Sequence, residues 1–260
     1  MKPSYQRRSS RRSMLKGVAA GTAGVAAVAG LAVGGFVLEE NKKSGDAHAA
    51  SYDDRSYRDT TDSIQTILNI AITAEHLAVT FYTNALRQAN RLGFNDTARM
   101  DIKAALIEEQ LHLNFLAKNG AKPLTRTFSF PDGIDTFRNM DKFIRTQQWL
   151  ETLFTAAYIV AGKEFAMLKR PDLVQVAGQI GTVEAEHRAI GRAIGGLTPA
   201  NNHAFSPIVL QKVGDAPMIL KNRGFLSPKN GNSYDYSEAD TNDRDVIQRS
   251  ANSTNWDWSW

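Results

Sequence analysis

The 260-residue chain contains no cysteine. This absence excludes a disulfide framework, a zinc–thiolate site, an iron–sulfur cluster and a cysteine nucleophile. No phosphate-binding loop, dinucleotide-binding fingerprint or serine–histidine–aspartate signature is present either. Any metal site must therefore be built from histidine and carboxylate ligands.

The main part of the chain also lacks an excess of positive charge. Residues 1–49 hold eight of the 31 basic residues but three of the 27 acidic ones, so the remaining 211 residues carry 23 basic and 24 acidic groups. A protein that binds nucleic acid collects phosphates through a basic surface. The balanced charge of residues 50–260 therefore argues against a nucleic-acid partner.

Residues 1–49 have the organisation of an export signal. An arginine pair, Arg11 and Arg12, precedes an uncharged stretch over 17–38 and a small-residue cleavage sequence at 47–49. This order is typical of a secretory signal peptide, and the arginine pair resembles a twin-arginine signal. We expect recognition by the twin-arginine export machinery and a mature protein in the periplasm, cell envelope or extracellular space. An uncleaved membrane anchor is the alternative.

The rest of the chain predicts an all-α fold. After a polar lead-in at 50–60, apolar residues recur every three or four positions through 61–196, in four segments of helical length. Two short connections flank a long one at 120–135, after which Asp135 can cap the third helix. This is the connectivity of an antiparallel four-helix bundle with one long crossover. Residues 197–260 predict an irregular extension, with a mobile acidic tail from residue 228.

Each predicted helix carries ionisable residues in the middle of its apolar stripe. A single buried, unpaired carboxylate costs several kcal/mol or more, so four of them need counter-charge. Four carboxylates and two neutral histidines balance the charge of two divalent cations. The spacing also fits a dinuclear carboxylate site, which takes one Glu from each of two helices and a Glu-x-x-His motif from each of the others. The predicted ligands are Glu75, Glu109, His112, Glu151, Glu184 and His187.

These residues form an internal repeat. Tyr82 follows Glu75 by seven residues, and Tyr158 follows Glu151 by seven, before each Glu-x-x-His motif. Core packing is the default role for both tyrosines, with a contact to a ligand or electron donation as the alternative. Three further carboxylates are expected to face solvent, with a contact to a ligand as the alternative: Glu108, Glu164 and Glu186.

The segments Thr73–Tyr82, Glu151–Tyr158 and Val183–His187 resemble helix signatures of the ferritin-like superfamily, in particular its exported, desiccation-related branch. The similarity covers about residues 61–196. It implies a ferritin-like bundle with the same six ligands, and iron, or alternatively manganese, as the metal.

The resemblance and the ligand pattern together suggest an oxidoreductase. We expect a di-iron or di-manganese centre that uses O2 or peroxide in iron oxidation or oxidative-stress protection. A stress-associated structural protein with a bracing metal site, or an iron store, is the alternative. Partners left open are a second copy of the chain, and a membrane or protein surface that contacts Trp256, Trp258 and Trp260.

Overall fold

The computed structural model describes residues 61–244, 246 and 248–252. The predicted signal and lead-in at 1–60 lie outside this part of the chain. So do Trp256, Trp258 and Trp260, and the predictions made for these segments stay predictions.

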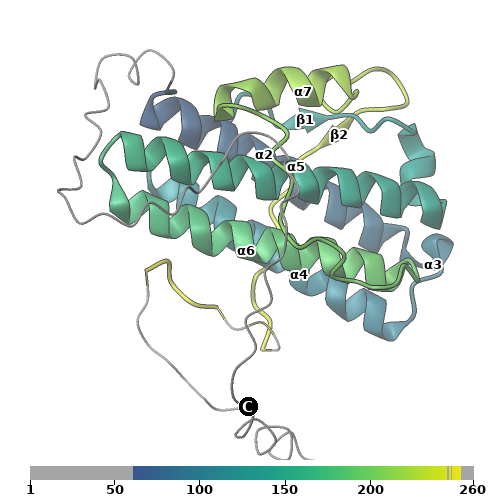
Figure 1. The fold of residues 1–260 in the computed structure, drawn as a ribbon. Helices are drawn as coiled ribbons and strands as arrows, with labels where there is room; N and C mark the ends of the chain where they lie inside the picture. Colours follow the sequence, from purple (N-terminus) through teal and green to yellow (C-terminus); the bar gives the residue numbers. More distant parts are fainter. Residues whose placement is uncertain (1–60, 245, 247, 253–260) are drawn as a thin grey trace, which may run out of the picture. The chain divides into compact units, whose positions relative to one another are not determined.

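Four long helices form the bundle, which confirms the predicted all-α fold (Figure 1). Helix α2 (Ile64–Arg87) packs against α4 (Asp96–Lys118), with the short α3 (Ala89–Leu92) between them in sequence. Helix α5 (Met140–Met167) packs against α6 (Pro171–Ile194). The short connections make each pair antiparallel, and the long crossover joins the two pairs.

Local sequence fixes where these helices begin. The side chains of Ser63, Asn95 and Asn139 accept a hydrogen bond from the backbone three residues on, as N-caps do. Pro171 occupies the first turn of α6, where its missing N–H costs nothing. The Asp135 cap predicted for the third helix is wrong. The turn before it continues into a 3-10 helix, η2 (Gly133–Phe137), and Phe137 is fully buried, so α5 begins at Met140.

The C-terminal extension is more ordered than the sequence predicts. It contains a 3-10 turn η3 (Val213–Asp215), helix α7 (Ala216–Asn222) and strand β2 (Tyr234–Asp235). Strand β2 pairs antiparallel with β1 (Thr127–Phe128) of the crossover. The predicted mobile tail is therefore wrong for residues 228–244. Their aromatic side chains pack on the crossover, as in the contact of Tyr234 with Phe130.

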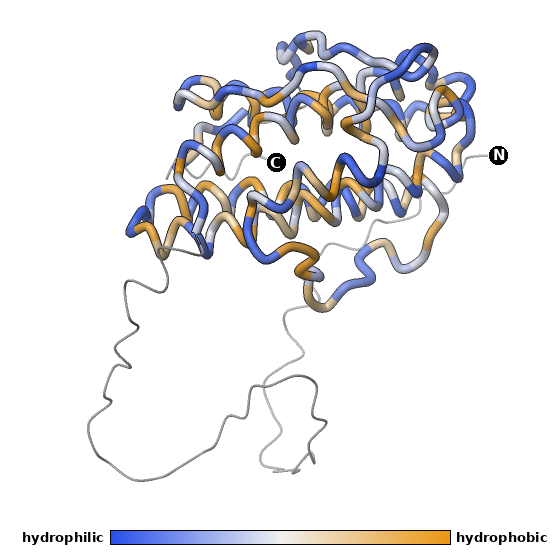
Figure 2. The backbone as a smooth tube through the Cα atoms, turned by 90° about the horizontal axis from the view of Figure 1, so that it is seen from above, coloured by the Kyte–Doolittle hydropathy of each residue, from blue (hydrophilic) through white to orange (hydrophobic). Residues whose placement is uncertain are grey.

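Hydrophobic and hydrophilic residues are interspersed along the helical part of the chain, as Figure 2 shows by colour. The buried apolar side chains form one core cluster. By length and composition α2 alone among the described helices could cross a membrane, but 67% of its apolar window is buried inside the protein. Its hydrophobicity is therefore explained by its place in the core.

Candidate metal centre

The four long helices bring all six predicted ligands together. One carboxylate comes from α2 (Glu75) and one from α5 (Glu151), while α4 and α6 each supply a Glu-x-x-His pair. All four carboxylates and His187 are at most 1% exposed. A helix repeats every 3.6 residues, so Glu and His three positions apart project from one face toward the same interior.

The ligand atoms form two overlapping groups. The first contains Glu75, Glu109, His112 and Glu184, and the second contains Glu109, Glu151, Glu184 and His187, with the atoms of each group within 4.8 Å of one another. Each group has the hard oxygen and imidazole donors that iron, manganese and other divalent metals accept.

Glu109 and Glu184 belong to both groups and turn one oxygen toward each histidine. For Glu109, Oε2 lies 3.6 Å from Nδ1 of His112, and Oε1 lies 3.1 Å from Nδ1 of His187. For Glu184, Oε1 lies 3.7 Å from Nδ1 of His112, and Oε2 lies 3.7 Å from Nδ1 of His187. Each of these carboxylates directs one oxygen toward His112 and the other toward His187, so each could serve a metal ion in either group.

The clearest sign that the ligands fit metal is a set of buried polar atoms without a hydrogen-bond partner. In folded proteins, a buried side-chain nitrogen or oxygen normally has such a partner. Six atoms of the centre have none: Glu75 Oε2, Glu109 Oε2, His112 Nδ1, Glu151 Oε2 and both carboxylate oxygens of Glu184. Leaving them unpaired is costly. All six lie on predicted ligands, so metal coordination would satisfy them. Three other buried atoms without a partner, on His76, Thr136 and Gln148, lie outside the predicted ligands.

The two tyrosines of the repeat each donate a hydrogen bond to a ligand of the other half. Tyr82 on α2 donates to Oε1 of Glu151, and Tyr158 on α5 donates to Oε1 of Glu75. Each bond occupies one oxygen and leaves the other facing the centre. Both tyrosines therefore orient ligands, in addition to packing in the core.

Gln147 is a part of the site that the sequence pattern does not reveal. Its amide donates to the Tyr82 hydroxyl at 3.3 Å and to the His187 carbonyl at 2.7 Å. Gly191 on α6 makes this possible, because a Cβ there would lie 2.1 Å from Oε1 of Gln147. The amide thus fixes Tyr82 and, through it, Glu151.

For Glu108 the sequence favours solvent exposure over a contact with a ligand, and the structure shows the contact. The structure places its carboxylate 2.8 Å from Nε2 of His187, with the side chain 35% exposed. A carboxylate on the outer nitrogen of a histidine fixes the ring and directs the other nitrogen to the metal. The spacing gives no signal for this role, because Glu108 lies beside a ligand on α4 and acts on a ligand of α6.

Burial and mutual repulsion control the charges of the carboxyl groups. Burial raises the pKa of Glu75 well above its ordinary value, and the neighbouring charges of Glu109 and Glu184 raise it further. Burial likewise raises the pKa of Glu151 and of Glu184, and repulsion between carboxylates adds to both effects. In the absence of a cation these three groups hold their protons more tightly than a carboxyl group in water does.

Glu109 differs because both histidines contact it. Burial raises its pKa, but the interactions with His112 and His187 outweigh burial, and the pKa lies below its ordinary value. Burial lowers the pKa of His187, but its contacts with Glu108 and Glu109 outweigh this effect, and the pKa is raised. Cations that bind here must therefore displace protons from both carboxyl groups and imidazole.

His112 is the ligand that reaches the surface, with 14% of its side chain exposed. It lines a cavity of about 280 Å³ between α4 and α6, together with Glu108, Gln179 and residues 249–251 of the extension. The backbone of Asn252 donates to Gln179 at 3.1 Å. This cavity, the His112 groove, has a mixed polar and apolar lining and connects His112 with solvent.

Two other predictions for carboxylates have different outcomes. Glu186 is exposed, as predicted. Glu164 is 2% exposed, so its predicted exposure is wrong. It accepts hydrogen bonds from the backbone of Asp62 at 2.8 Å and of Val213 at 2.9 Å. It therefore joins α5 to the start of α2 and to the extension, outside the centre.

Comparison with known proteins agrees with this geometry. Neither curated proteins nor solved structures give a match to the chain. The family model of the ferritin-like domain matches residues 63–196, which run from the N-cap of α2 to just beyond α6. This match covers more than half of the chain and all six ligands, and the chain therefore belongs to the ferritin-like domain family.

Proposed function

We propose that the bundle binds two divalent transition-metal ions, with iron favoured over manganese, and that the protein is an oxidoreductase that acts with O2 or peroxide. The six unpartnered ligand atoms carry the proposal, because two cations would satisfy them and they belong to residues that form two groups. Four carboxylates and two neutral histidines balance two divalent charges. The family and the buried cluster both fit a dinuclear metal protein.

In this proposal Glu109 and Glu184, which belong to both groups, would help to hold both ions, and Glu75 and Glu151 would each help to hold one. A pair of redox-active metal ions supplies the electrons that a small oxidant accepts. The chain's own part is to hold the ligands before metal arrives. The crossed bonds from the two tyrosines fix the carboxylates of Glu75 and Glu151, so little reorganisation accompanies binding.

The surroundings of His112 and His187 differ, and in this proposal the two histidines have different roles. His187 is buried and held by Glu108, which suits a tightly retained ion. His112 lies at the groove, where water-soluble reactants and protons can reach it. Fe(II) oxidation and peroxide removal both need such an exchange with solvent. The proposal also includes export through the pair Arg11 and Arg12, which suits a role in oxidative-stress protection in the cell envelope or outside the cell.

The test compares two substitutions on α6. Metal-free protein is reconstituted with Fe(II) or Mn(II), the bound metal is counted by elemental analysis, and turnover is measured with Fe(II) plus O2 and with peroxide. We expect about two ions per chain in the wild type. Glu184→Gln should bind fewer ions and lose turnover, whereas exposed Glu186→Gln should retain both.

Two results would contradict the proposal. If the wild type binds neither Fe(II) nor Mn(II) inside the bundle, the proposed dinuclear site is wrong. Wild type that binds two ions but turns over neither Fe(II) nor peroxide would indicate that the metal braces the bundle, which is the structural alternative.

A further inference from the structure

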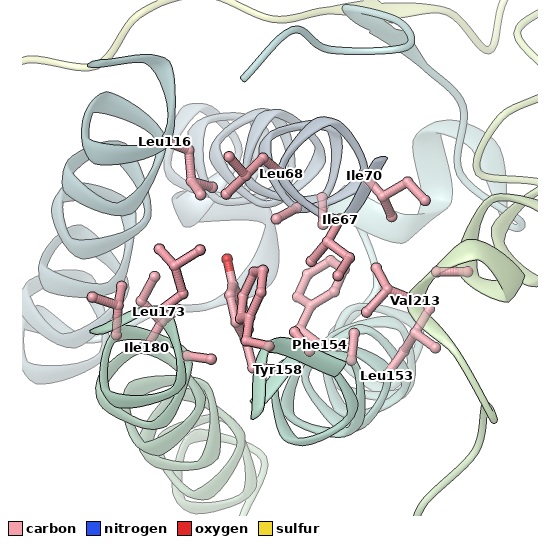
Figure 3. Close-up of a pocket in the computed structure, with 18 of the residues that line it drawn as sticks. Ile67, Leu68, Ile70, Leu116, Leu153, Phe154, Tyr158, Leu173, Ile180 and Val213 are labelled. Carbon is pink, nitrogen blue, oxygen red and sulfur yellow. The ribbon is translucent and has the colours of Figure 1, made fainter. Parts of the chain in front are cut away.

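An apolar cavity lies between the four long helices beside Tyr158 (Figure 3). Its volume is about 40 Å³. Among the described residues that line it, every side chain is apolar except that of Tyr158, whose hydroxyl donates to Glu75. Ala74, the neighbour of Glu75 in α2, also contributes to the lining. The cavity therefore adjoins the candidate metal centre on its Glu75 side.

The internal repeat places larger side chains at two positions that correspond to small lining residues of this cavity. Residues of α2 correspond to residues of α5 that lie 76 positions later, as Glu75 corresponds to Glu151. Ala157 of the cavity then corresponds to Phe81. The Phe81 ring stacks on Phe143 with the ring centres 5.0 Å apart and fills the space beside Tyr82.

A second lining residue differs in the same way. Ala71 corresponds to Gln147, whose amide donates to the Tyr82 hydroxyl. One tyrosine is therefore enclosed by a phenyl ring and an amide, and the other has alanines at both places. The two halves share their ligands, so ligand geometry alone does not explain the alanines.

We infer that this cavity binds dioxygen. An engineered apolar cavity of about 150 Å³ admits benzene. A volume of about 40 Å³ suits a diatomic molecule instead. Water needs two to four polar partners to occupy a cavity, and this lining offers one hydroxyl that is already bonded.

The lining also distinguishes the two oxidants that the proposed function leaves open. Hydrogen peroxide donates and accepts hydrogen bonds and would lose them on entering an apolar cavity. Dioxygen has no such bonds to lose. The role that follows rests on the proposed function: the cavity holds O2 beside the Glu75 side of the centre, while reactants from solvent reach the centre at His112.

Crystals of the full chain, pressurised with xenon and separately with O2, test the binding directly and without turnover. We expect density for both gases beside Tyr158 in the wild type. Ala157→Val adds two methyl groups to the lining and should abolish that density. Ala166→Val makes the same change at an exposed position of the same helix and should leave it in place. If Ala157→Val does not fold, buried Ala161→Val fills the same cavity.

The possible results separate the two proposals. If neither xenon nor O2 gives density in the wild-type cavity, the inference is overturned. If xenon binds and O2 does not, the assignment of dioxygen as the occupant is overturned. In the metal-loaded protein, Ala157→Val should raise the KM for O2 and leave turnover with peroxide unchanged, and an unchanged KM overturns the delivery role. If wild type shows no turnover at all, the proposed function fails, while the gas density still decides what the cavity binds.

Discussion

The metal-free protein should lose stability as the pH rises from about 5 to 6.5. In this window unfolded glutamates are ionised, because their pKa is about 4.3. In the folded protein, burial and repulsion raise the pKa values of Glu75, Glu151 and Glu184. A group whose folded pKa is raised contributes stability below its unfolded pKa and loses it as the pH rises toward the folded pKa. All three carboxyl groups therefore act in the same direction.

The magnitude follows from proton linkage. Each carboxyl group that is protonated when folded and ionised when unfolded lowers the free energy of unfolding by about 1.4 kcal/mol per pH unit. Three such groups set an upper limit of about 4 kcal/mol per pH unit. Buried His76 opposes them, because burial lowers its pKa and the unfolded chain binds its proton more readily in this window. Glu109 has a lowered pKa, is ionised in both states and adds nothing here. His187 has a raised pKa and starts to contribute, in the same direction, above about pH 6.5, where unfolded histidine loses its proton.

Urea denaturation of metal-free protein at several pH values measures this slope. Glu151→Gln removes one of the three groups and should reduce the slope by up to about 1.4 kcal/mol per pH unit. Exposed Glu186→Gln should leave the slope unchanged. Metal should reverse the trend, because cations bind the ionised ligands more tightly as protons leave. Stability of the metal-free protein that is flat or rises across the window would refute this account of the centre.

Three further outcomes are expected. Arg11→Lys with Arg12→Lys should leave unprocessed precursor in the cytoplasm in a fractionation assay, and normal export would remove the twin-arginine assignment. Glu108→Gln should weaken metal binding by about 10- to 100-fold in a titration, because a charged partner of a ligand histidine is lost. Tyr82→Phe and Tyr158→Phe should each destabilise the metal-free protein by about 1–3 kcal/mol in urea denaturation, because a buried carboxylate oxygen loses its donor. Equal stability of the wild type and the two variants would show that these bonds are not significant.

The bundle and the inward faces that carry the six predicted ligands could be predicted, because both depend on the spacing of residues along one helix. Helical periodicity places Glu109 and His112 on one inward face, and the same rule applies to Glu184 and His187. The cost of burying four unpaired carboxylates then requires that they meet around counter-charge. Neither step needs knowledge of how the helices pack.

Contacts between helices could not be predicted, because they depend on the rotation of each helix and on its neighbours. The two tyrosines follow the ligands of their own halves in sequence, yet each bonds to a ligand of the opposite half. Glu108 is an ordinary exposed carboxylate by its position in α4, and the approach of α6 gives it a partner. The order of the C-terminal extension could not be predicted for a related reason. Its polar composition conceals Tyr234 and Tyr236, which contact rings of the crossover and of α2.

The repeat is closest in the ligands and diverges in the residues around them. Glu108 on α4, which contacts His187, corresponds to Val183 on α6, so His112 has no equivalent carboxylate at that position. His187 is buried beside its carboxylate, whereas His112 faces the groove. A site that only braced the bundle would gain nothing from this difference, since both positions would serve equally well. The difference supports the proposed function, in which one position would retain its ion and the other would meet reactants from solvent.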